Sequence, residues 1–174
     1  MVKKAHSLLD LLRKTFCEIS PLVLSKLYRT YVRPILEFSN SVWTPVLQRD
    51  INQLESVQRR ATRIPFGRIR PQYLERLSLM RLTTLSERRF RGDLITTYRA
   101  VNNPSSPICH LFVLNSNQIT RGHSFELIKE RCTSTARRTF LTNRVVNHWN
   151  PLPDDIVTSQ SLLVFKKRYD EHNV

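Results

Sequence analysis

Apolar residues recur at intervals of three and four along most of this chain, which is the spacing of an amphipathic α-helix. Two signals mark helix starts. Ser20 followed by Pro21 is typical of an N-cap and a first helical residue, and Thr84 with Glu87 forms a capping box. Pro34 should interrupt the second helix, because proline lacks the amide hydrogen that a helix interior uses. The predicted helices cover 3–16, 21–32, 35–43, 47–64, 72–79, 85–101, 134–149 and 161–172.

The scarcity of glycine argues against a β fold. The chain has 3 glycines, whereas strand hairpins usually need more of them in their turns. Residues 102–133 show no apolar period and contain "NNPSSP", which predicts a long central loop or connector. We therefore expect an all-α fold, a small irregular bundle of about six to eight helices. Its predicted parts are a helical domain over 1–101, the connector over 102–133 and a helical extension over 134–174, with Trp43 and Trp149 largely buried.

The predicted 47–64 helix separates apolar from basic residues. Its apolar positions form one stripe; they are Leu47, Ile51, Leu54, Val57, Ala61 and Ile64. Arg49, Arg59 and Arg63 fall on the opposite side of a helical wheel, and Arg60 lies on the flank. A solvated helix face usually mixes charges of both signs, but Glu55 is the only acid near the last three arginines in the sequence. This imbalance favours a face that meets an anion.

The predicted 85–101 helix repeats this arrangement, and a basic loop, "RIPFGRIRP", lies between the two. Residues 55–94 carry arginine but no lysine. Arginine presents a planar fork that fits phosphate oxygens in a bidentate manner, whereas lysine acts as a point charge. The two helices and the loop are therefore predicted to cradle a sugar–phosphate backbone. The candidate nucleic-acid-binding residues are Arg49, Arg59, Arg60, Arg63, Arg68, Arg70, Arg88, Arg89, Arg91 and Arg99.

The overall charge supports the same partner. The 174 residues include 28 Lys and Arg against 14 Asp and Glu, a formal net charge of +14. Nucleic acid is the commonest polyanion that such a chain binds; the alternative is a basic structural protein. The 3 cysteines are too few for a disulfide framework and fit an intracellular compartment, nucleus or cytoplasm. No stretch is apolar enough to cross a bilayer, so no membrane partner is expected.

The sequence predicts no active site, metal or cofactor. Cys109, His110, His123 and Cys132 match no compact zinc motif, since no C-x-x-C pair anchors them. The adjacent acids Asp154–Asp155 follow "PLP" and are interpreted as first-turn residues of a helix, where acids suit the macrodipole. A two-metal polymerase or nuclease centre needs separated carboxylates that converge on magnesium, and the chain offers no such set.

Several long phrases resemble a known family. "LYRTYVRPILEFSNSVWTPVLQRDINQLESVQRRATRI", "YLERLSLMRLTTLSERRFRGDLITTYRAV", "TRGHSFELIKERCTSTARRTFLTNRVVNHWNPLP" and "SLLVFKKRYDEH" are similar, in order, to the region after the polymerase palm in jockey-like non-LTR retrotransposon reverse transcriptases. The resemblance implies an all-α thumb followed by a helical extension, a fragment of an RNA-directed DNA polymerase. It also implies that the catalytic aspartates lie in a palm domain outside this chain.

The resemblance further implies a function. A thumb of this family grips the template–primer duplex along its phosphates, and here that grip would fall to the 47–64 and 85–101 helices. The strongest candidates are Arg59, Arg60, Arg63, Arg88, Arg89 and Arg91. The expected partners are RNA, an RNA–DNA hybrid or a DNA duplex, together with the palm domain of the parent polymerase. The alternative is an inert structural remnant of a decayed element, whose exposed apolar surface would favour association.

Overall fold

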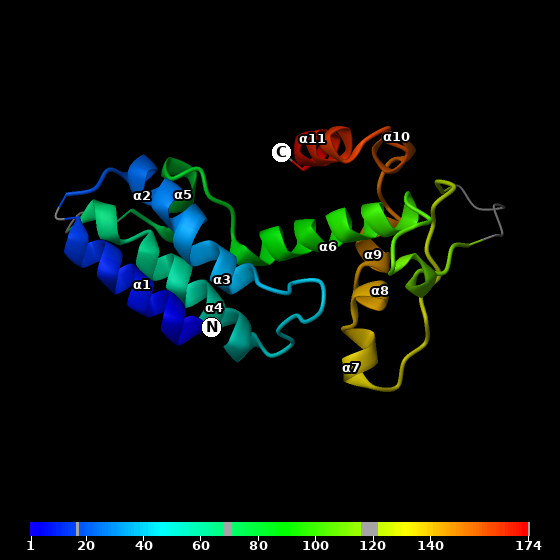
Figure 1. The fold of residues 1–174 in the computed structure, drawn as a ribbon, viewed down its shortest axis with the longest axis horizontal. Helices are drawn as coiled ribbons and strands as arrows, with labels where there is room; N and C mark the ends of the chain where they lie inside the picture. The colour runs from blue at the N-terminus through cyan, green and yellow to red at the C-terminus, as the bar shows by residue number, and fades with distance from the viewer. Residues whose placement is uncertain (17, 68–70, 116–121, 174) are drawn as a thin grey trace. The chain divides into compact units, whose positions relative to one another are not determined.

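The chain is all-α. The computed structural model describes residues 1–16, 18–67, 71–115 and 122–173 (Figure 1). These residues contain no strand, only one isolated antiparallel bridge between Leu114 and Leu127. The longer elements are α1 Val2–Thr15, α2 Pro21–Leu27, the π-helix η1 Tyr28–Val32, α3 Arg33–Glu37, α4 Gln48–Ala61, α5 Tyr73–Leu79, α6 Leu85–Val101 and α11 Leu162–His172. The shorter ones are η2 Ile64–Phe66, η3 Cys109–Leu111, α7 Thr135–Arg138, α8 Leu141–Arg144, α9 Val146–Trp149 and α10 Asp154–Val157.

The chain divides into two compact units, and the division falls inside α6. Unit 1 comprises Met1–Asn40 and Pro45–Arg89, and unit 2 comprises Ser41–Thr44 and Phe90–Val174. The predicted boundaries at residues 101 and 133 differ from this division. The reason is that residues 102–133 contribute core side chains, Phe112 and Leu127, to the hydrophobic cluster of unit 2. That cluster also contains Trp149, which is fully buried as predicted, whereas Trp43 is partly exposed.

The predicted helix starts are confirmed by their hydrogen bonds. The Ser20 hydroxyl accepts from the Val23 amide, and the Ser161 hydroxyl accepts from the Val164 amide. Thr84 and Glu87 form a reciprocal capping box: the Glu87 amide donates to the Thr84 hydroxyl at 3.2 Å, and the Thr84 amide donates to the Glu87 carboxylate at 3.0 Å. Each contact satisfies an amide that the first turn of a helix leaves without a partner.

The second predicted helix passes Pro34 without a break, because the turn before it widens. A proline cannot donate to the carbonyl four residues back, and its ring crowds that carbonyl. Here η1 relieves the conflict, since the Arg33 amide bonds to the Tyr28 carbonyl, five residues back. The prediction that helix continues over 35–43 is wrong. It ends at Glu37, and Ser39 adopts a left-handed φ of 54°, which no α-helix accommodates.

The predicted 134–149 helix is three short ones, α7, α8 and α9. The interruption between α7 and α8 lies at Phe140, which is extended with φ −63° and ψ 147°. The turn is held because the Arg144 guanidinium, on α8, donates to the Thr139 carbonyl at 2.9 Å. The break leaves Leu141, Val145 and Trp149 buried in the unit 2 cluster.

Two asparagines fix part of the segment that was predicted to be a connector. The Asn143 amide accepts from the Glu130 N–H at 3.1 Å and donates to the Glu130 carbonyl at 3.2 Å. Asn150 makes the same pair of bonds with Leu127, each at 3.0 Å. A side-chain amide thus takes the place that a neighbouring strand would occupy. These two clamps explain how residues 127–130 stay extended against α8 and α9 without forming a sheet.

Candidate nucleic-acid interface

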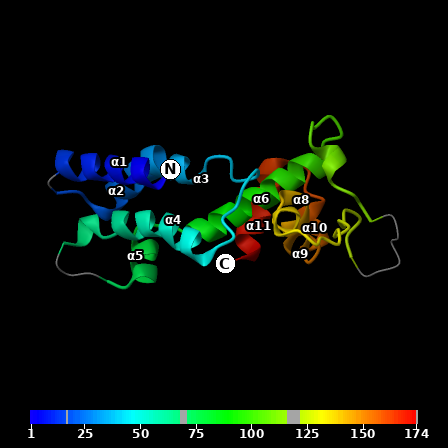
Figure 2. The ribbon, with the colours of Figure 1, turned by 90° about the horizontal axis from the view of Figure 1, so that it is seen from below.

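Helices α1 and α4 of unit 1 form the scaffold of the predicted basic surface. They run side by side in the same direction, so their C-terminal ends lie at the same end of the unit (Figures 1 and 2). The predicted apolar stripe of α4 is confirmed in its second half, where Leu54, Val57 and Ala61 are buried. It fails at Leu47, which is 59% exposed and precedes the helix.

The stripe also carries polar residues that the sequence did not single out. Glu55 is 7% exposed and Gln58 is fully buried. Glu55 accepts hydrogen bonds from the Tyr73 hydroxyl, from Gln58 and from the Leu85 amide at the start of α6. Gln58 in turn accepts from Tyr28 at 3.0 Å. Glu55 therefore ties α4 to α5 and α6 and forms no ion pair with the arginines near it in sequence.

The acid that pairs with α4 comes from α1 instead. Arg60 forms a salt bridge of 2.5 Å with Asp10 and contacts the His6 ring at 3.2 Å. Arg49, at the other end of α4, lies 3.4 Å from Asp50. The expectation that only Glu55 could neutralise this helix is therefore wrong, because α1 supplies a carboxylate from about fifty positions away in the chain.

The predicted outer face of α6 in unit 1 is neutralised or covered. Arg88 forms a bidentate pair with Glu37, at 2.5 Å from Nε and 3.4 Å from Nη2. Arg89 is 6% exposed and donates to the Leu36 carbonyl at 2.6 Å. The placement of Arg89 on an open face is wrong, since this side chain lies under the turn that ends α3.

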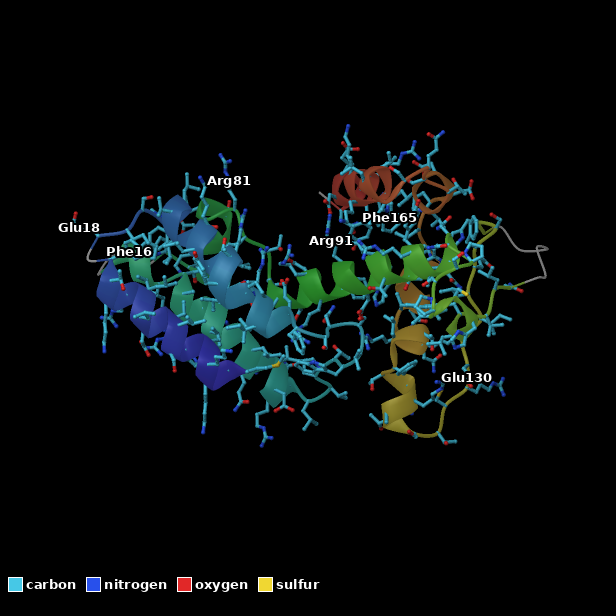
Figure 3. The ribbon with its side chains drawn as sticks, viewed as in Figure 1. Phe16, Glu18, Arg81, Arg91, Glu130 and Phe165 are labelled. Atoms are coloured by element: carbon cyan, nitrogen blue, oxygen red, sulfur yellow. The ribbon has the colours of Figure 1, made fainter. Side chains whose placement is uncertain are left out.

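The part of α6 in unit 2 follows the same trend. Arg91 reaches towards α11 (Figure 3), where both its Nε and Nη2 bond to Asp170 at 2.6 and 2.7 Å. Hydrogen bonding to Asp170 raises the pKa of the Arg91 guanidinium. Arg99 is exposed. Of the four arginines predicted on α6, only Arg99 remains both exposed and outside any ion pair among the described residues.

A smaller set of cations remains open at the shared C-terminal end of α1 and α4. Arg13, Lys14, Arg59 and Arg63 are exposed, and none forms an ion pair within the described part of the chain. Arg59 lies over the Tyr73 ring at 5.2 Å. Lys14 and Arg13 were not among the predicted residues, although their position in the last turn of α1 was readable. Arg68 and Arg70 lie outside the described residues.

The register of the two helices places these cations along one seam, which we call the basic end (Arg13, Lys14, Arg59 and Arg63). Asp10 pairs with Arg60, and three residues further along each helix come Arg13 and Arg63. Positions three apart share a helix face. Because both helices advance about 1.5 Å per residue, this second pair follows the salt bridge by about one turn and carries two like charges. An anion would balance them.

The remaining chemistry is sparse. No three His, Cys, Asp or Glu side chains come together as a metal site among the residues searched, so Cys109, His110, His123 and Cys132 form no such group. Asp154 and Asp155 occupy the first turn of α10, as predicted. No helix in the described ranges is long and apolar enough to span a membrane.

Comparison with known proteins adds no assignment. A scan against protein-family models gives no match, and searches of curated proteins and of solved structures give no significant match either.

Proposed function

We propose that this chain is a non-catalytic module that binds the phosphate backbone of nucleic acid through the basic end of unit 1. The observation that carries the proposal is the group of exposed cations, Arg13, Lys14, Arg59 and Arg63, without acidic partners in the described part of the chain. The resemblance to the thumb of jockey-like non-LTR reverse transcriptases supports the same function, with an RNA–DNA hybrid or a duplex as the partner.

The chemistry of the basic end fits a backbone better than a base sequence. Three of its four cations are arginines, whose forked donors match phosphate oxygens. Arg59 is held over the Tyr73 ring, which limits its freedom before binding. Cations at helix C-termini also stabilise their own helices through the macrodipole, by about 0.3–1 kcal/mol each. That structural role leaves the charged groups in solvent, where a phosphate reaches them.

Fluorescence anisotropy with a labelled RNA–DNA hybrid and a labelled DNA duplex, over a salt series, tests the proposal. Four phosphate contacts predict a slope of about −3.6 for log affinity against log salt. The variant Arg59→Glu/Arg63→Glu should lose most of the affinity and flatten the slope by about 2. Its matched control is Arg99→Glu/Arg138→Glu, which makes the same charge change at two exposed residues of unit 2.

A second candidate is a structural module without binding activity. It is favoured by the ion pairs that neutralise Arg60, Arg88 and Arg91, all of them predicted binding residues. Under this alternative, neither nucleic acid binds at low salt and both double variants behave like the parent chain. Equal loss in the two double variants would instead indicate attraction by net charge alone, without a basic end.

A further inference from the structure

A second group of cations in unit 1 lies apart from the basic end. Arg29 in η1, Arg33 at the start of α3 and Arg88 in α6 surround one carboxylate, Glu37. We call these four residues the Glu37 cluster. Arg88 holds Glu37 through both oxygens, while the Nε of Arg33 lies 3.6 Å from it. Three guanidinium groups against one carboxylate leave a local excess of two positive charges.

The cluster is half buried, which distinguishes it from a solvated surface. The side chains of Arg33, Arg88 and Glu37 are 18%, 28% and 24% exposed. Charges in such a position are screened less by water and salt than exposed ones. Burial, together with the nearby Arg88 and Arg29, lowers the pKa of Arg33. Arg33 therefore feels more repulsion than Glu37 offsets.

The donors of the cluster outnumber its acceptors. Each guanidinium carries five N–H groups. One Nη of Arg29 donates to the Arg81 carbonyl, but its Nε is buried and has no acceptor among the described residues. A buried donor without an acceptor costs stability. The π-helix that holds Arg29 is a rare conformation that occurs frequently at functional sites, and it places Arg29 directly before α3.

We propose that the Glu37 cluster binds one phosphate group, a tetrahedral dianion whose charge equals the local excess. Guanidinium forks from η1, α3 and α6 approach from separate elements, as a group with three or more acceptor oxygens requires. A carboxylate ligand offers two oxygens, and Arg88 already occupies those of Glu37. The source of the phosphate is either a free phosphate compound or the terminal phosphate of an oligonucleotide. This site uses none of the residues of the basic end.

NMR titration of the full chain with inorganic phosphate and with pyrophosphate tests the site. The Nε–Hε signals of Arg29, Arg33 and Arg88 should shift saturably, with chloride at equal ionic strength as the control. Arg33→Gln should weaken phosphate binding by at least about tenfold, since hydrogen bonds to charged groups contribute that much. Arg99→Gln in unit 2 should leave it unchanged. Unshifted side-chain signals at millimolar phosphate would mean an internal ion network only and would overturn the proposal.

Glu37→Gln provides a test in the opposite direction. Removing the carboxylate that competes for Arg88 should tighten phosphate binding, and added phosphate should raise the melting temperature of this variant more than that of the parent chain. Equal or weaker binding would contradict the site. If Glu37→Gln does not fold, Arg29→Gln takes its place, with an expected loss of about tenfold.

The source of the phosphate follows from a paired comparison. Two oligonucleotides of one sequence, with and without a 5′-phosphate, are titrated into the full chain and into Arg59→Glu/Arg63→Glu. Tighter binding of the phosphorylated strand in both proteins assigns the cluster to a nucleic-acid end. Shifts with inorganic phosphate but no such preference assign it to a free phosphate compound. Because the double variant leaves the cluster intact, failure of the basic end and failure of this site give different results.

Discussion

Replacement of Glu55 by glutamine should destabilise unit 1 far more than the loss of one surface charge would. The Glu55 carboxylate accepts from the Leu85 amide at 3.1 Å, from Gln58 at 3.4 Å and from the Tyr73 hydroxyl. Leu85 is the first residue of α6 and is 2% exposed, so water does not replace this acceptor. Glutamine keeps the shape but turns one acceptor oxygen into a donor.

The expected cost is about 2–3 kcal/mol, because a hydrogen bond to a charged group contributes about 1.5–3 kcal/mol and the variant leaves a buried donor opposed to another donor. Both tryptophans, Trp43 and Trp149, belong to unit 2, so tryptophan fluorescence does not report on this change. Amide hydrogen exchange in unit 1 does. The Val57 amide, in the buried part of α4, should exchange roughly fifty-fold faster.

Glu75→Gln is the matched control, since Glu75 is an exposed acid on α5. A surface change of this kind is expected to stay within about 0.5 kcal/mol. If Glu55→Gln accelerates exchange no more than Glu75→Gln does, Glu55 is not the node that joins α4 to α5 and α6. The polar network would then contribute nothing beyond the apolar packing around it.

Three further changes have defined outcomes. Burial first, and Glu55 next, raise the pKa values of Tyr28 and Tyr73; the unfolded chain therefore loses these protons first, so the stability of unit 1 is retained below about pH 10 and falls above it, which urea unfolding by circular dichroism will show, with a smaller fall in Tyr73→Phe. Asn143→Leu removes both bonds to Glu130 and should cost about 2–3 kcal/mol, measured by Trp149 fluorescence in urea; no shift would mean that the clamp is dispensable. Arg81→Gly should stabilise unit 1 by about 1 kcal/mol, because Arg81 has a φ of 52° in the turn after α5 and its side chain points away from the ribbon (Figure 3); a lower melting temperature would contradict this.

The sequence predicted the elements whose signals are local. Caps at Ser20, Thr84 and Ser161 were readable because each depends on residues three positions apart. The effect of Pro34 was not, since proline forbids an ordinary α-turn but does not say whether the helix ends or widens. The two asparagine clamps were equally invisible, because Asn143 and Asn150 act on backbone groups more than ten residues away.

The candidate site was predicted less well than the fold, for an electrostatic reason. A helical wheel shows which side chains share a face, but it does not show which acids the fold brings to that face. Asp10, Glu37 and Asp170 lie 50, 51 and 79 positions from the arginines they pair with. The sequence could identify an excess of arginine; only the tertiary arrangement separates the paired arginines from Arg59 and Arg63.

The path of the chain between its two units limits how the protein can be dissected. Ser41–Thr44 belongs to unit 2 although both flanking stretches belong to unit 1, and the chain crosses again within α6. No single truncation or protease cut therefore releases either half intact. A shortened version ending at residue 89 would strand four foreign residues and sever a helix after its second turn, so the binding assays require the whole polypeptide.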